Sequence, residues 1–290
     1  MSFLNKLRGS LAVITFLFIH NCLFAQDHVN SRLYFNNWKI VNPAAAGFHE
    51  SQKFDINFAS TFMNPSNVLL SWESKIIKPS SGVGLIFENY NFGLLSNVNA
   101  SVLYNYQIDI DEKNTLSFGS NLNYISQTFD DTFDFQGDMD IAINDSYPAS
   151  TFDIGLGVAY KSENFQGGVS FRNILESEIY PSYLDRPSKN TTGHLTAYAQ
   201  YLFGDGNFYF IPSAFLDTNY ERLYFDINPT FKLMNFILIG GGARFSGEYR
   251  SYNLRTGFDW QEKIQFSCIF YSTDYNSAVK NIEFGISINP

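Results

Sequence analysis

One run of acidic residues has the side chains that a metal ion could bind. The stretch DDTFDFQGDMDIAIND carries Asp130, Asp131, Asp134, Asp138 and Asp140. Calcium favours such oxygen-rich loops. However, the EF-hand spacing, with glycine at position six and glutamate at position twelve of the loop, is absent. We therefore expect a solvated acidic loop, with these aspartates as a candidate calcium site, and we predict no other metal and no cofactor.

Residues that could catalyse a reaction are sparse. The histidines are His20, His28, His49 and His194. A Ser-His-acid site needs three side chains to converge in space, and we expect His194 instead to make hydrogen bonds beside Thr196. If the first segment is removed with Cys22, only Cys268 remains and no internal disulfide can form. The sequence therefore predicts a protein that is not an enzyme.

A compact segment near the N-terminus is the other candidate site. Its sequence is YFNNWKIVNPAAAGF, at positions 34–48. Within it, Pro43 and Gly47 fix turns at low conformational cost. The residues of this candidate partner-binding or plug motif are Trp38, Asn42, Pro43, Ala44 and Gly47. Its role depends on the elements around it.

The composition indicates a membrane barrel. Among 290 residues, 30 Phe and 18 Tyr bring the aromatic share to 18%, while charged residues make up only 16%. Soluble domains usually carry about 25% charged residues. A barrel in a bilayer needs an apolar outer wall with aromatic girdles. The net charge of −9 and the lack of a basic cluster argue against nucleic-acid binding.

The first 25 residues have the pattern of a cleaved signal peptide. Lys6 and Arg8 precede the apolar run LAVITFLFIHNCLFA, and Leu23 and Ala25 fit a cleavage site before Gln26. Lipoprotein processing at Cys22 is the alternative. No later run is long and apolar enough for a membrane helix, so we expect strands to span the membrane. The predicted organisation is a signal peptide at 1–25, an N-terminal periplasmic or plug segment at 26–51, and an outer-membrane barrel at 52–290.

Period-two alternation recurs along the whole of the predicted barrel. In KNIEFGISIN, for example, Ile282, Phe284, Ile286 and Ile288 alternate with small or polar residues. About fourteen such stretches occur, and twelve or sixteen strands remain open. They lie near 52–62, 66–77, 81–90, 95–108, 114–127, 150–161, 164–174, 190–202, 207–217, 220–232, 235–246, 249–260, 262–272 and 280–290. The fold class is therefore all-β, a transmembrane antiparallel β-barrel.

The connections alternate in length. Short turns such as DEK, KSEN, GDGN, LMN and QEK alternate with a set that includes two long loops. Outer-membrane barrels have short periplasmic turns and longer external loops. A soluble pair of β-sandwich domains is the alternative, but no linker or change in composition divides the chain. We therefore expect the short turns and both chain ends on the periplasmic side.

The inward face of the predicted strands carries charges of both signs. They are Glu88, Asp153, Lys161, Arg172, Asp226, Arg255 and Asp259. A ring of one sign would indicate an ion-selective pore. The mixture favours a filled or plugged lumen.

The order of these features resembles the PorP/SprF family of outer-membrane proteins. The similarity lies in Asn42-Pro43-Ala44-Ala45-Ala46-Gly47, in FDIGLGVAYKSENFQGGVSFRNIL, in the hairpin HLTAYAQYLFGDGNFYFIPSAFL and in GGGARFSGEYR. The resemblance covers most of the chain after the signal peptide. It implies a component of the type IX secretion and gliding machinery that supports secretion or surface attachment of a large adhesin.

The resemblance also implies partners, namely periplasmic type IX components and a cell-surface adhesin, in addition to outer-membrane lipid. Within such a barrel, the 34–48 segment could plug the lumen, dock on a periplasmic partner, or tie down the chain terminus. The alternative function is an outer-membrane channel or transporter for small or apolar solutes.

Overall fold

The computed structural model describes most of the chain after the expected signal peptide. The described ranges are 32–48, 52–61, 66–76, 80–92, 95–129, 148–180, 189–219, 222–247, 249–273 and 276–290. The expected signal peptide at 1–25 and the candidate calcium residues at 130–140 lie outside these ranges. No helix in the described part of the chain is long and apolar enough to cross a membrane.

Strands make up most of the described chain. They are β1 (Lys53–Thr61), β2 (Ser66–Ile76), β3 (Ser81–Phe92), β4 (Leu95–Asp109), β5 (Thr115–Phe129), β6 (Pro148–Lys161), β7 (Phe165–Arg172), β8 (Glu178–Tyr180), β9 (Lys189–Asn190), β10 (His194–Tyr201), β11 (Phe203–Asp205), β12 (Phe208–Ile211), β13 (Ser213–Thr218), β14 (Leu223–Ile227), β15 (Thr230–Leu233), β16 (Ile237–Ser246), β17 (Tyr249–Trp260), β18 (Ile264–Thr273) and β19 (Asn276–Ile288). Each predicted strand stretch overlaps one or two of them.

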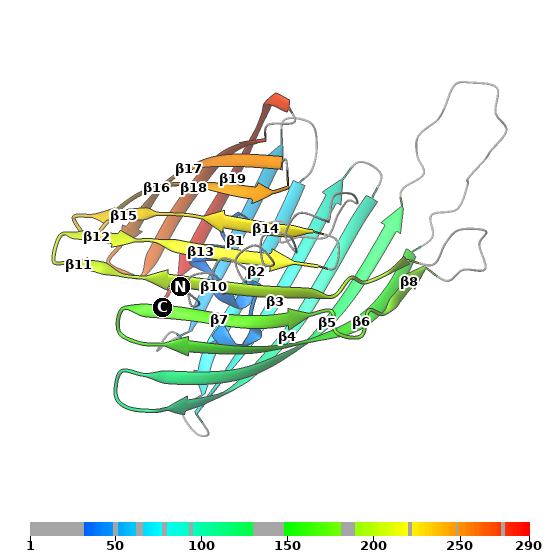
Figure 1. Cartoon of the computed structure of the whole chain (residues 1–290), viewed down its shortest axis with the longest axis horizontal. Helices are drawn as coiled ribbons and strands as arrows, with labels where there is room; N and C mark the ends of the chain where they lie inside the picture. The colour runs from blue at the N-terminus through cyan, green and yellow to red at the C-terminus, as the bar shows by residue number, and fades with distance from the viewer. Residues whose placement is uncertain are drawn as a thin grey trace, which may run out of the picture.

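The strands close into one antiparallel barrel (Figure 1). β1 pairs with β2 on one side and with β19 on the other, where Phe54 lies opposite Ile288. Closure leaves the described wall without a free edge strand. Breaks at Leu202, Pro212 and Pro229 each split one wall strand into two labelled parts, and proline cannot donate to a strand ladder. With each split strand taken as one, the described wall has fourteen strands, as predicted.

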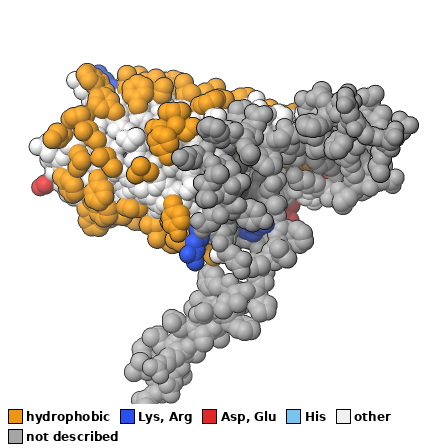
Figure 2. All heavy atoms as spheres, turned by 90° about the horizontal axis from the view of Figure 1, so that it is seen from above, with side chains coloured by type: hydrophobic (Ala, Val, Ile, Leu, Met, Phe, Trp, Pro, Cys, Tyr) orange, Lys and Arg blue, Asp and Glu red, His pale blue; other side chains and the backbone are white. Residues whose placement is uncertain are grey.

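The two faces of the wall differ as the alternation predicts. In β1, Phe54, Ile56 and Phe58 are exposed on the outside, while Asp55 and Asn57 are buried inside. The space-filling view shows hydrophobic side chains spread over the described outer surface (Figure 2). Such a surface suits contact with lipid and would be unusual in water.

The two ends of the barrel also differ. Turns at 110–114, 162–164, 206–207, 234–236 and 261–263 lie at one end, which we call the short-turn end. β5 ends and β6 begins at the opposite end, and most of the long predicted loop at 129–150 lies outside the described residues. Between β7 and β10, β8 and β9 form a separate two-stranded sheet, which the sequence did not predict.

The apolar core lies in the lumen and comes mostly from one segment of chain. We call residues 32–48 the lumenal segment; Figure 1 shows it in blue, enclosed by the wall. The core cluster combines Leu33, Tyr34, Phe35, Trp38, Val41, Ala44, Ala45 and Phe48 of this segment with Ala159, Tyr198, Phe215 and Ile269 of the wall. The barrel is therefore packed around its own N-terminal segment.

Candidate functional site in the barrel lumen

The lumenal segment forms three short 3-10 helices instead of one long helix. They are η1 (Tyr34–Asn36), η2 (Trp38–Ile40) and η3 (Pro43–Ala45). Asn37 and Asn42 separate them, with φ values of −151° and −143°, far from the helical value near −63°. Pro43 opens η3, at a position where a missing N–H loses no helical hydrogen bond.

Asn42 joins the segment to two adjacent wall strands. Its side chain is fully buried. Oδ1 accepts a hydrogen bond from the Ala44 N–H at 2.9 Å and so caps η3. Nδ2 donates to the carbonyl oxygens of Val158 at 3.0 Å and Val169 at 3.2 Å. These two residues face each other across β6 and β7, so the Asn42 amide joins a capped helix to a strand pair.

Wall glycines allow the segment to approach this closely. A Cβ atom added at Gly119 would lie 2.6 Å from Ala44 Cα, and one at Gly168 would lie 2.6 Å from Asn42 Nδ2. A Cβ at Gly82 would overlap the Ala46 carbonyl oxygen. Real Cβ atoms are not found at such distances, since non-bonded carbon atoms prefer about 3.5–4.0 Å. The glycines on the inward face therefore form a seat for η3.

Two amide side chains of β4 satisfy the carbonyl groups at the end of η3. Asn105 Nδ2 donates to the carbonyl oxygen of Ala46 at 2.6 Å, with longer contacts to Pro43 and Ala44. Gln107 Nε2 donates to the carbonyl oxygens of Ala46 and Gly47, both at 3.3 Å. A helix end leaves carbonyl groups without partners inside the helix. These amides supply the donors that water would otherwise supply.

A buried group of charges holds the middle of the segment. Lys39 Nζ lies 2.8 Å from Asp55 and 3.1 Å from Glu73, and all three side chains are almost fully buried. Glu73 also accepts a hydrogen bond from the Gly47 N–H at 2.6 Å. Gly47 has a φ of +69°, which other residues rarely adopt. One carboxylate therefore joins η2 to the turn that follows η3.

Aromatic contacts fix the other side of the segment. The Trp38 ring stacks on Tyr198 of β10 with centroids 4.4 Å apart and an interplanar angle of 13°. Its Nε1 donates to Gln200 at 2.9 Å. The Tyr34 hydroxyl donates to Asp226, which also pairs with Arg244 at 2.7 Å. The Trp38 N–H and the Tyr34 hydroxyl thus each have a partner, as buried Trp and Tyr usually require.

The lumenal segment touches every one of the fourteen described wall strands. The contacting wall residues, from β1 to β19, include Asp55, Glu73, Gly82, Asn105, Gly119, Val158, Ser170, Tyr198, Phe215, Asp226, Arg244, Arg255, Ser267 and Glu283. At its C-terminal end the Phe48 carbonyl accepts from Lys161, next to a short turn. The segment is held from all sides.

The structure brings together all five residues of the predicted motif. Trp38, Asn42, Pro43, Ala44 and Gly47 are all inside the lumen. The candidate calcium aspartates lie outside the described residues, and no group of three or more His, Cys, Asp or Glu in the described ranges could hold a metal ion. His194 makes the expected hydrogen-bonding contact, with Nδ1 3.0 Å from Asp217.

Sequence reasoning missed the wall side of the site. Asn105 and Gln107 belong to no recognisable motif in the sequence. Lys39 and Glu73 lie too far apart in the chain to suggest an ion pair. One signal was present: Gly82, Gly119, Gly157 and Gly168 all fall on the inward phase of their strands. Several inward glycines in neighbouring strands indicate that something other than wall side chains fills the lumen.

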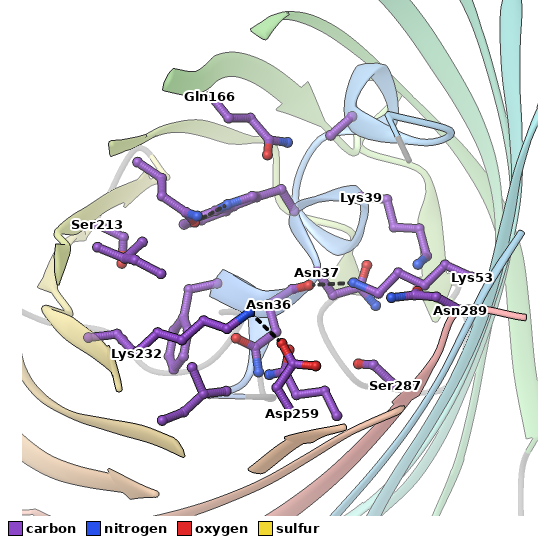
Figure 3. Close-up of a pocket in the computed structure, with 18 of the residues that line it drawn as sticks. Asn36, Asn37, Lys39, Lys53, Gln166, Ser213, Lys232, Asp259, Ser287 and Asn289 are labelled. Carbon is purple, nitrogen blue, oxygen red and sulfur yellow. Dashed lines mark hydrogen bonds and ion pairs between the residues drawn. The ribbon is translucent and has the colours of Figure 1, made fainter. Parts of the chain in front are cut away.

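A polar cavity remains between the lumenal segment and the wall. Its volume is about 230 Å³. Figure 3 shows Lys232 beside Asp259, and Lys53 directed toward the segment from the other side. The charged residues of its lining are Lys39, Lys53, Glu73, Lys232, Arg255 and Asp259. The lining also includes Gln265 and Asn289. Both lie close to the short-turn end of the barrel, so the cavity is in that half of the lumen.

Comparison with known proteins identifies a family. Residues 23–287 match the family described as type IX secretion system membrane protein PorP/SprF. No curated protein matches the sequence.

Several solved outer-membrane barrels share the fold. The outer membrane protein Omp33 of Acinetobacter baumannii is 8% identical with a TM-score of 0.55, over 84% of this chain and 100% of that one. The toluene transporter TbuX of Ralstonia pickettii is 11% identical with a TM-score of 0.55, over 86% and 92%. A FadL homologue of Pseudomonas aeruginosa is 8% identical with a TM-score of 0.55, over 85% and 91%. These similarities show the fold, an outer-membrane β-barrel.

Proposed function

The chain belongs to the PorP/SprF family of type IX secretion system membrane proteins, and from this membership we propose a non-enzymatic role in protein secretion. In this proposal the signal peptide at 1–25 directs export, and the barrel sits in the outer membrane with its short turns in the periplasm. It supports secretion or surface attachment of a large adhesin. Its partners are periplasmic type IX components and that adhesin.

The occupied lumen is the structural observation that favours this role over that of an open channel. The lumenal segment contacts the wall on all sides through hydrogen bonds, ion pairs and stacked rings. The segment therefore lies in the path that a solute would take through the lumen. A barrel closed in this way is better suited to a structural role in a machine than to constant diffusion of solutes.

A channel for small or apolar solutes is the second candidate. It is supported by the fold shared with TbuX, which is a toluene transporter. Uptake of a radiolabelled apolar solute into cells with and without the gene distinguishes the two functions. Uptake that depends on the protein, with secretion unchanged by its loss, would favour the channel.

Affinity purification tests the first candidate directly. A tagged copy is expressed from its own locus, extracted from outer membranes in mild detergent, and its companions are identified by mass spectrometry. We expect type IX components or one large surface protein to copurify. Recovery of the barrel alone, under conditions that keep another type IX complex intact, would count against a role in the machinery.

A further inference from the structure

Arg255 of β17 is the cation in the cavity lining that has no carboxylate partner among the described residues. Each lysine of the lining lies within 4 Å of an acidic side chain. Arg255 is only 6% exposed. Its Nη1 donates to Thr230 at 3.3 Å, and its Nε has no acceptor in the described structure. Its guanidinium lies 4.4 Å from the centroid of the Phe35 ring.

A buried guanidinium without an anion is unfavourable, because removing a charge from water has a free-energy cost that a partner must offset. The aromatic contact with Phe35 offsets only part of this cost, because the attraction between a cation and an aromatic ring is weaker than a buried ion pair. The planar guanidinium has its donors arranged to bind a carboxylate through two parallel hydrogen bonds. We propose that the cavity is a binding site for a carboxylate group, which pairs with Arg255.

The cavity has room for more than the carboxylate itself. An engineered cavity of about 150 Å³ holds a benzene molecule, and this one measures about 230 Å³. Side chains of Gln166, Gln200 and Ser213 line it and offer hydrogen bonds, while Ile211 and Leu238 offer apolar contact. This lining suits the end of a peptide or a small organic acid.

The position of the cavity indicates the source of the carboxylate. It lies in the half of the lumen next to the short turns, which the proposed function places in the periplasm. A peptide of a periplasmic partner, carrying a free C-terminus or an acidic side chain, would enter from that side. This assignment of the source rests on the proposed function, whereas the carboxylate site itself does not. A free small carboxylate is the other source.

The test measures binding to the purified full-length barrel in detergent at low chloride, by isothermal titration calorimetry. The probes are acetyl-trialanine with a free carboxylate, the same peptide as its amide, and sodium acetate. We expect the free peptide to bind and the amide not to bind. Arg255→Gln should weaken binding at least about tenfold, because it removes a charge-assisted bidentate contact. Arg255→Lys should retain part of the affinity.

Arg250→Gln is the matched control, since Arg250 lies on the same strand but is exposed. It should bind like the wild type. Binding of acetate but not of the peptide, with the same dependence on Arg255, would support the carboxylate site and assign it to small acids. No binding of either carboxylate, or equal binding by Arg255→Gln, would overturn the proposal.

A thermal scan without ligand separates a binding role from a structural one. If Arg255 pairs with an anion only when the ligand binds, Arg255→Gln should melt at the same temperature as the wild type or higher. Acetyl-trialanine should raise the melting temperature of the wild type but not that of Arg255→Gln. A lower melting temperature of Arg255→Gln without ligand, together with no effect of the peptide on the wild type, would show a structural role. Neither measurement depends on secretion, so failure here leaves the proposed function untouched.

Discussion

Lys39 shows how much one buried residue contributes to the lumenal segment. It lies in η2 and pairs with carboxylates from β1 and β2. Removing one member of a buried ion group leaves uncompensated charge in a place from which water is largely excluded. Such changes cost about 3–5 kcal/mol. Asp55 keeps a second, longer contact to Lys53 at 3.5 Å, so the lower part of that range applies.

We predict that Lys39→Met lowers the free energy of unfolding by about 3 kcal/mol. Equilibrium unfolding of the refolded protein in detergent and urea measures the change. Lys113→Met is the matched control, because Lys113 forms a 2.6 Å pair with Glu163 in which both side chains are more than half exposed. Exposed pairs contribute little, so this control should unfold like the wild type. Equal effects of the two substitutions would contradict the assigned role of Lys39.

At the scale of elements, η3 and the wall form a fitted pair. The segment offers alanines and main-chain atoms, and the strands offer inward glycines and the amides of Asn105 and Gln107. Over Gly82 and Gly119, the nearest atoms of the segment are main-chain atoms of Pro43, Ala44 and Ala46. Backbone atoms cannot move aside as a flexible side chain can, so this contact should be sensitive to a single added methyl group.

We predict that Gly119→Ala displaces the lumenal segment while the barrel still forms. The added Cβ would lie 2.6 Å from Ala44 Cα and from the Pro43 carbonyl carbon. Trypsin should then cleave after Lys39, which is 2% exposed in the wild type, and mass spectrometry of the fragments detects this cut. Ser120→Ala changes the next residue of β5, which is exposed, and should leave Lys39 protected. Protection of Lys39 in both variants would show that the wall tolerates the extra atom.

At the scale of the whole molecule, the fold is a closed wall built around its own N-terminal segment. Barrels of eight strands are filled by their own side chains, and barrels of about 16–18 strands enclose an aqueous channel. A wall of fourteen strands lies between these cases. Here inward residues are often small, and the lumenal segment supplies eight of the twelve residues of the apolar core cluster in the described structure. Without it, the lumen should hold water.

Deletion of residues 32–48 should therefore convert the protein into an open pore. In planar lipid bilayers we expect stable ion conductance from the deletion variant and closed or rare, brief openings from the wild type. A variant that replaces the same residues with a Gly/Ser linker of equal length controls for chain length, and it should also conduct. If the wild type conducts as well as the deletion variant, the segment does not close the barrel and the channel function gains support.

The sequence by itself determined the wall. Period-two alternation placed Phe54, Ile56 and Phe58 outside and Asp55 and Asn57 inside, because successive strand residues point to opposite faces. The apolar outer surface and the aromatic content then required a bilayer. The alternation and the turns are local properties, because each strand shows its own alternation and each short turn shows where a strand ends. The small sheet of β8 and β9 escaped prediction because its strands are only two or three residues long.

Only the tertiary structure decided what fills the lumen. The sequence left the 34–48 segment between three roles, because its partners are far away in the chain. Asn42 bonds to Val158 and Val169, and the Arg32 N–H donates to Glu283 across 251 positions. Such contacts exist only after β1 pairs with β19 and the wall closes. The local pattern of a strand specifies which face is inward, but the space enclosed by fourteen strands, and the chain that occupies it, arise from closure.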